Sequence, residues 1–141
     1  MKLSTQIKHN LLAIISLCVA LSTLSYNTWR NEQSEANRNV RQAGFEIIKH
    51  VGELQKISYM THYDKNIVKS NPIIGWTEVL ILKDLSRLMP TTVQDKADAL
   101  TTIWGKSWQG LKDEDDLSLA DIDIALHELR MEALNNMEQL E

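Results

Sequence analysis

The residues best suited to chemistry in this sequence are a consecutive histidine, tyrosine and aspartate. His62, Tyr63 and Asp64 place a titratable ring, an aromatic hydroxyl and a carboxylate side by side. Such a cluster can bind a small ligand or a partner protein, although these residue types more often cap a helix and satisfy loop backbone groups. We predict that the cluster lies in an interhelical loop, and we treat its three residues as candidate contacts for a ligand or a partner.

Three tryptophans form a second set of candidates. Trp104 and Trp108 are four residues apart on one apolar helical stripe, and Trp76 opens the most apolar segment that follows residue 71. This spacing favours core packing, with each indole N–H directed to an acceptor. The functional alternative is an aromatic-lined pocket between helices. On that alternative Trp76, Trp104 and Trp108 are candidate contacts for a ligand.

The sequence predicts no catalytic, cofactor or metal site. Residues 105–107 read like the end of a phosphate loop, but position 100 is leucine where that loop requires glycine. The only cysteine, Cys18, lies in an apolar segment, and no strained turn presents another nucleophile beside a base. Glu-x-x-His pairs, which build di-metal sites in helical bundles, are missing at His50, His62 and His127. We therefore expect a protein that is not an enzyme.

Composition narrows the structural and functional classes further. The chain has 141 residues, of which 43% are hydrophobic and 24% charged, as is usual for a folded domain. Five glycines and two prolines disfavour turn-rich sandwiches and barrels, and a single cysteine excludes a disulfide framework. The net charge of −4 argues against nucleic acid as a partner.

The N-terminal part has the pattern of a membrane anchor. Twenty-one uncharged residues separate Lys8 from Arg30, and a helix over residues 10–29 would be about 30 Å long, which matches a bilayer core. Tyr26 and Trp29 suit the membrane interface at its exit. We predict a cytoplasmic stub at residues 1–9, a transmembrane signal-anchor helix at residues 10–29 in the inner membrane of a bacterial envelope, and a periplasmic domain at residues 30–141.

Two other interpretations of this segment stay open. Its strictly apolar part, residues 11–24, has the length of a signal-peptide core, and residues 20–22 have the small-x-small pattern of a cleavage site. Cleavage would release a periplasmic protein. An ordinary buried helix is the third interpretation. Lys2 and Lys8 favour a cytoplasmic N-terminus, although arginines after residue 29 weaken this asymmetry.

Residues 30–141 show helical periodicity throughout, so we predict an all-α fold. Apolar residues recur at gaps of three and four, and the first helix can continue the anchor as one rod. An antiparallel four-helix bundle is the expected packing, with residues 79–82 the most buried segment. Gly44 and Gly52 either weaken the first helix or permit a close helix crossing. The expected helices cover residues 32–63, 72–89, 92–111 and 118–140, capped by Asn71 before Pro72, by Thr92 with Asp95, and by Ser118 with Asp121.

Charge is unevenly distributed along the domain. Residues 113–141 contain ten acidic residues and only one basic residue, Arg130, which gives −9. An ordinary solvated face is the favoured interpretation. The alternatives are an acidic docking face, or pairing with the cations of the first helix, which are Arg38, Arg41, Lys49 and Lys56.

These observations predict a non-enzymatic accessory or regulatory protein. In layout the chain resembles membrane-anchored bacterial sensor and accessory proteins, with one spanning helix followed by an exported helical domain. The expected partners are the lipid bilayer and either another protein or further copies of the chain. The alternative function is an extracytoplasmic, sensor-like module that binds a small ligand between its helices.

Overall fold

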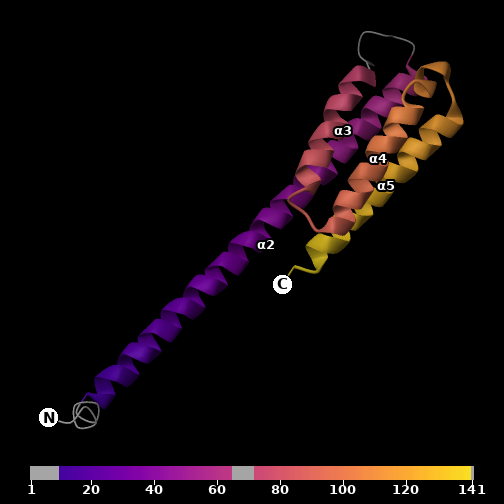
Figure 1. The fold of residues 1–141 in the computed structure, drawn as a ribbon. Helices are drawn as coiled ribbons and strands as arrows, with labels where there is room; N and C mark the ends of the chain where they lie inside the picture. Colours follow the sequence, from indigo (N-terminus) through magenta and orange to yellow (C-terminus); the bar gives the residue numbers. More distant parts are fainter. Residues whose placement is uncertain (1–9, 65–71, 141) are drawn as a thin grey trace. The chain divides into compact units, whose positions relative to one another are not determined.

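The fold was analysed in a computed structural model, which describes residues 10–64 and 72–140. These residues form four α-helices and one 3₁₀ helix, and they contain no strand, as the sequence predicts (Figure 1). The predicted stub at residues 1–9 and the cap at Asn71 lie outside the described residues. The elements are α2 (Leu11–Tyr63), α3 (Pro72–Ser86), α4 (Thr91–Ser107), η1 (Gly110–Asp113) and α5 (Asp116–Glu138).

The chain divides into two compact units, Met1–Asn37 and Arg38–Glu141. Helix α2 contributes to both, which confirms that the apolar segment and the amphipathic segment after it form one helix. Its N-terminal part is long and apolar enough to cross a membrane, and no residue of that stretch is buried. By length and composition the same stretch also fits a signal sequence or the core helix of a soluble protein.

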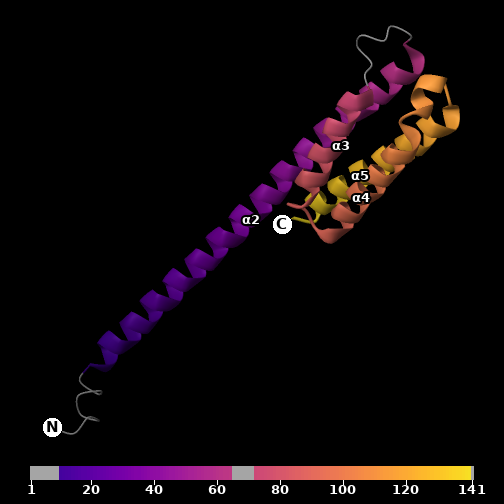
Figure 2. The same cartoon turned by 45° about the horizontal axis from the view of Figure 1, so that its top comes forward.

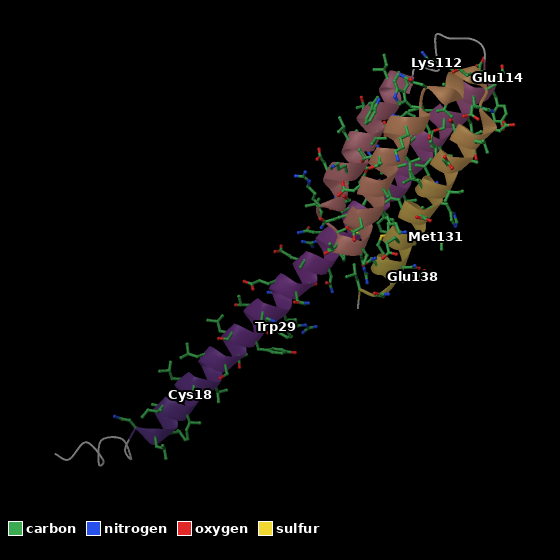
Figure 3. The ribbon with its side chains drawn as sticks, turned by 45° about the vertical axis from the view of Figure 1, so that its right-hand side comes forward. Cys18, Trp29, Lys112, Glu114, Met131 and Glu138 are labelled. Atoms are coloured by element: carbon green, nitrogen blue, oxygen red, sulfur yellow. The ribbon has the colours of Figure 1, made fainter. Side chains whose placement is uncertain are left out.

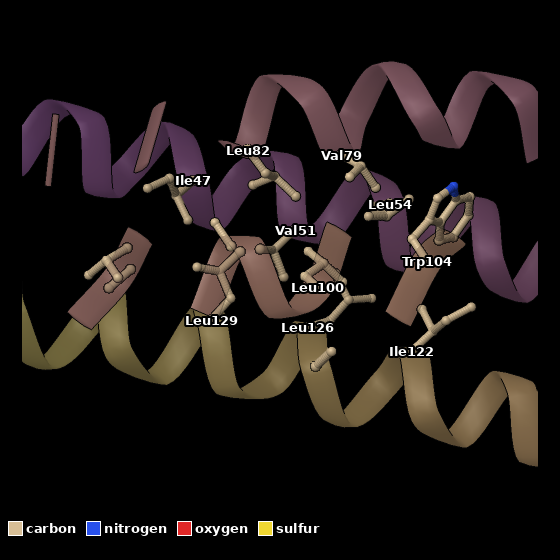
Figure 4. Packing of buried hydrophobic residues seen from close by; sticks show 14 of the residues in the cluster. Ile47, Val51, Leu54, Val79, Leu82, Leu100, Trp104, Ile122, Leu126 and Leu129 are labelled. Carbon is tan, nitrogen blue, oxygen red and sulfur yellow. The ribbon is translucent and has the colours of Figure 1, made fainter. Parts of the chain in front are cut away.

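All four α-helices of the second unit contribute to one hydrophobic core. Figure 4 shows the stripes of the helices meeting along their length, and α4 packs against both α3 and α5 (Figures 1 and 2). The buried residues recur every three or four positions, which is the spacing predicted from the sequence. The largest of the fully buried side chains are Ile47, Val51, Leu54, Val79, Leu82, Val93, Leu100, Trp104, Leu111, Ile122, Leu126 and Leu129.

Helix α3 ends earlier than predicted. It begins at Pro72, as expected, but its last residue is Ser86 and not Met89. The backbone N–H groups of residues 87, 88 and 89 donate to carbonyls three residues earlier, so the chain tightens into a turn before Pro90. The Ser86 hydroxyl supports this end by donating to the Lys83 carbonyl at 2.7 Å.

The two predicted helix caps at α4 and α5 are wrong. Helix α4 begins at Thr91 behind Pro90, and no side chain caps it, so Thr92 and Asp95 form no capping box. Helix α5 is capped by Asp115, whose carboxylate accepts from the Leu117 N–H at 3.1 Å. It also accepts from the Ser118 hydroxyl at 2.6 Å. These hydrogen bonds lower the pKa of the Asp115 carboxyl, and the bond from Ser118 contributes more than the bond from Leu117.

The prediction that residues 79–82 are the most buried segment is also wrong. Val79 and Leu82 are buried, but Leu80 is 55% exposed and Ile81 only partly buried. Helix α3 packs on one side only, and its other side exposes apolar residues together with Thr77 and Asp84. We call the residues Ile73, Leu80 and Leu88, which are 63%, 55% and 61% exposed, the α3 outer face.

Of the two α2 glycines that could permit a close helix crossing, Gly44 lies in close contact with α5 and Gly52 lies at an ordinary distance from it. A Cβ atom at Gly44 would overlap the side chain of Met137. A Cβ at Gly52 would lie 4.0 Å from Nη2 of Arg130, so that guanidinium sits over a residue without a side chain. The two helices run antiparallel, because Gly44 faces the end of α5 and Gly52 faces its middle.

Candidate functional site

The structure places His62 at the end of α2 and not in a loop. Its ring belongs to the last helical turn, and its side chain is only 3% exposed. Nε2 lies 3.1 Å from Oδ1 of Asp116, the first residue of α5. Nδ1 is buried and has no hydrogen-bond partner among the described residues. The histidine therefore joins the end of α2 to the start of α5.

Tyr63 and Asp64 flank this contact. Tyr63 closes α2, is 71% exposed and meets the His62 ring edge-on at 4.6 Å. Asp64 follows the helix, and its backbone N–H donates to the Met60 carbonyl at 3.0 Å. An open hollow at this end of the unit is lined by His62, Tyr63, Glu114 and Asp116; Figure 3 labels Glu114 in the turn before α5.

The tryptophans form a separate group between α3 and α4. Trp104 is fully buried in the core, as the core-packing interpretation predicts, and Trp108, next to the end of α4, packs against the same core. A Cβ atom at Gly75 would overlap the Trp104 ring, and a Cβ at Gly105 would touch Trp76 at 3.5 Å. Gly75 of α3 thus lies against Trp104 of α4, and Gly105 of α4 lies against Trp76 of α3. The expected acceptor for the Trp104 indole N–H is missing among the described residues.

A polar row between α2 and α5 was not predicted. The Tyr59 hydroxyl donates to Asp123 at 2.7 Å, and Gln55 Nε2 reaches the same carboxylate at 3.4 Å. Arg130 donates to the Gln55 side chain at 3.5 Å, and its Nε is buried without a partner in the described part of the chain. The sign of this polar row in the sequence was Arg130, the one basic residue in an acidic stretch.

A second buried contact joins α2 to α3. Nδ1 of His50 lies 2.6 Å from the Glu78 carboxylate, and both side chains are largely buried. Glu46, one turn before His50, lies 3.9 Å from the other ring nitrogen. The i,i+4 pairing of Glu46 and His50 is visible in the sequence, but Glu78 belongs to another helix and gave no signal.

Comparison with protein-family models, with curated proteins and with solved structures gives no match.

The geometry therefore assigns these polar groups to contacts between helices. His62 binds Asp116, Tyr59 binds Asp123 and His50 binds Glu78, so each contact joins α2 to another helix of the unit. Within the described residues, no three side chains of the metal-binding types come together.

The Tyr59–Asp123 hydrogen bond makes a testable prediction. It raises the pKa of Tyr59 above its usual 10.0, because ionisation would place a second negative charge beside Asp123 and lose the donated proton. The contribution of this bond to stability is complete below pH 10.0 and is lost as the pH rises above it. We expect Asp123→Asn to lower the Tyr59 pKa. Tyrosinate absorbance, titrated against a Tyr59→Phe control, measures the shift, and an unchanged titration would contradict the assignment.

Proposed function

We propose that this protein is a non-enzymatic, single-pass membrane-anchored accessory protein, whose exported helical domain binds a partner protein. The domain is proposed to be an antiparallel four-helix bundle in the periplasm, with the N-terminus of the chain in the cytoplasm. The observation that carries the proposal is the α3 outer face, an exposed apolar surface on a unit that already has a complete core.

The anchor is supported by the exposure of α2. In its N-terminal part the apolar side chains are exposed on every side, including Leu12, Leu17 and Leu24, which are 81%, 59% and 64% exposed. A helix that is apolar all round and uncovered suits a lipid environment. Ser22 and Thr23 satisfy their hydroxyls within the helix by donating to carbonyls four residues earlier, as membrane helices require.

The α3 outer face suits a protein partner better than a small molecule. Its exposed residues Ile73, Leu80 and Leu88 extend along the whole of α3 and into the turn after it, and their aliphatic side chains offer no directional hydrogen bonds. Burial of such side chains stabilises a complex through removal of apolar area from water. We therefore propose that an apolar surface of another protein in the same envelope packs against α3.

The proposal predicts loss of the partner when this face is charged. Leu80→Glu with Leu88→Glu is expected to abolish recovery of a stoichiometric protein from native membranes in mild detergent, as measured by mass spectrometry. Ala99→Glu, at an exposed position of α4, is the matched control and should leave recovery unchanged. Unaltered recovery with the double variant, or a chain that purifies with no other protein, would contradict the proposed function.

A further inference from the structure

A second exposed apolar surface lies where α2 and α5 run side by side. Its apolar members are Phe45 and Tyr63 on α2, and Leu117, Ile124 and Met131 on α5; their exposed fractions are 65%, 71%, 77%, 57% and 41%. We call these five residues and the cations and carboxylates beside them the α2–α5 face. Met131 is labelled on α5 in Figure 3.

Both helices present this face with a seven-residue period. Leu117, Ile124 and Met131 are seven apart, which is two helical turns, so they line one side of α5. Phe45, Gly52 and Tyr59 have the same spacing on α2. Tyr59 contacts Asp123, and Gly52 lies beside Arg130, so this side of α2 borders α5. The two stripes therefore form one continuous surface.

Lysines of α2 and carboxylates of α5 flank the two apolar stripes, and Glu46 and Glu53 lie among the lysines of α2. Lys49 and Lys56 lie one helical turn after Phe45 and Gly52, and they are 66% and 65% exposed. On α5, Asp121 and Glu128 stand in the same relation to Leu117 and Ile124. The present partners of these charges are exposed groups of their own chain: Glu46 for Lys49, Glu53 for Lys56, and Lys96 for Glu128 at 3.2, 3.9 and 2.9 Å.

We propose that the α2–α5 face binds the same face of a second copy, with α2 of one copy against α5 of the other. A two-fold axis parallel to the helices produces this arrangement. Lys56 then meets the acidic stripe of the partner, and the apolar stripes cover each other. A perpendicular axis in the plane of the face would place α2 on α2, with lysine against lysine.

The heights of the charges along the helices agree with this axis. Within one chain Gly52 is level with Arg130 and Tyr59 is level with Asp123. Lys56, between those positions, is therefore level with the turn between Asp121 and Glu128. A two-fold axis parallel to the helices preserves height, so Lys56 of one copy reaches these two carboxylates of the other.

The membrane anchor selects the same axis, and this step rests on the proposed function. When two copies are anchored in one membrane, each chain enters its helical unit at residue 38 from the same side. A two-fold axis along the helices keeps the two Arg38 ends together, whereas a perpendicular axis would separate them by the length of the domain. Charge and anchoring thus point independently to one arrangement.

Cross-linking of mixed single-cysteine chains tests the pairing. In a Cys18→Ala background, membranes that contain both the Lys56→Cys chain and the Glu128→Cys chain are treated with a short bismaleimide. We expect a mixed dimer from this pair, and none when Leu80→Cys on the α3 outer face replaces Lys56→Cys. Absence of the mixed dimer, or an equal yield from the α3 control, overturns the proposal.

Charge reversal tests the electrostatic part. Lys49→Glu with Lys56→Glu is expected to weaken dimerisation of the full chain in detergent by about tenfold, since each substitution replaces an attraction across the interface by a repulsion. Mixing this chain with an Asp121→Lys and Glu128→Lys chain should restore dimers, which misfolding would not allow. Lack of rescue overturns the proposal.

The mass of the purified chain shows whether the N-terminal segment has been cleaved. It therefore distinguishes failure of the dimer proposal from failure of the proposed function. A chain that keeps its first residues but gives no mixed dimer overturns the dimer and leaves the anchor intact. A chain cleaved near residue 23 overturns the anchor, and the cross-link then decides the dimer alone.

Discussion

Trp104→Ala is expected to lower the free energy of unfolding of the helical unit by about 3–5 kcal/mol, the usual cost of removing a large aromatic side chain from a core. Trp104 has no exposed surface and lies against the backbone of Gly75, where no other side chain can occupy the space. Thermal unfolding of the full chain in mild detergent, followed by circular dichroism, measures the loss.

Trp29→Ala provides the matched control. Trp29 belongs to the N-terminal unit and is 60% exposed, so its removal should leave unfolding of the other unit unchanged. If the buried tryptophan instead served to bind a ligand, Trp104→Ala would stay as stable as the parent chain and lose only binding. Equal stability of Trp104→Ala and Trp29→Ala would therefore contradict the core assignment.

The partner glycine makes the prediction sharper. Gly75→Ala alone should destabilise the unit by about 1–3 kcal/mol, because its Cβ would overlap the Trp104 ring and overpack the interface. In the Trp104→Ala background the same change should cost far less, since the ring is gone. A double-mutant cycle measures this coupling, and additive effects would show that the two residues do not share the space.

Most of the helical architecture follows from the sequence for a simple reason. Apolar residues at gaps of three and four bury one side of a helix wherever that helix packs, so the stripes of α4 and α5 lead directly to core residues such as Leu100 and Ile122. Pro72 fixes the start of α3 because its missing N–H is tolerated in a first turn. These signals act within a few residues, and the sequence contains them in full.

The predictions that proved wrong concern features that depend on neighbouring helices and turns, which the pattern of a single helix does not specify. Helix α3 is apolar nearly all round, so its pattern cannot show which side has no neighbour, and Leu80 proves to be exposed. Which residue caps a helix depends on the backbone conformation of the turn that precedes it. At α5 the left-handed residue Glu114, with φ of 57°, brings Asp115 to the N-cap three positions before the predicted Ser118.

The candidate site was only partly predictable for the same reason. His62 and Tyr63 were identified by residue type, but the pairing of His62 with Asp116 depends on the register of two helices far apart in the sequence. The row of Gln55, Tyr59 and Asp123 has no local signature at all. The reciprocal packing of Gly75 and Gly105 on tryptophans likewise arises only from the antiparallel placement of α3 and α4.

Replacing Leu17 and Leu21 by arginine is expected to remove the chain from the membrane. Both side chains lie in the uncovered apolar part of α2 and are 59% and 55% exposed. An arginine at the centre of a spanning helix costs about 2.5–3.5 kcal/mol on insertion scales, so the two together oppose insertion by roughly twice that amount. Alkaline extraction of membranes, followed by detection of the chain in pellet and supernatant, measures the change.

Leu17→Ala with Leu21→Ala is the matched control, because alanine preserves the helix and adds no charge. The three interpretations of this segment then give different results. An uncleaved anchor keeps the parent and the alanine chain in the pellet at full mass and releases the arginine chain. A signal sequence gives a soluble parent shortened by its first residues. A core helix of a soluble protein gives a soluble parent of full mass, and either of these last two results would refute the anchor.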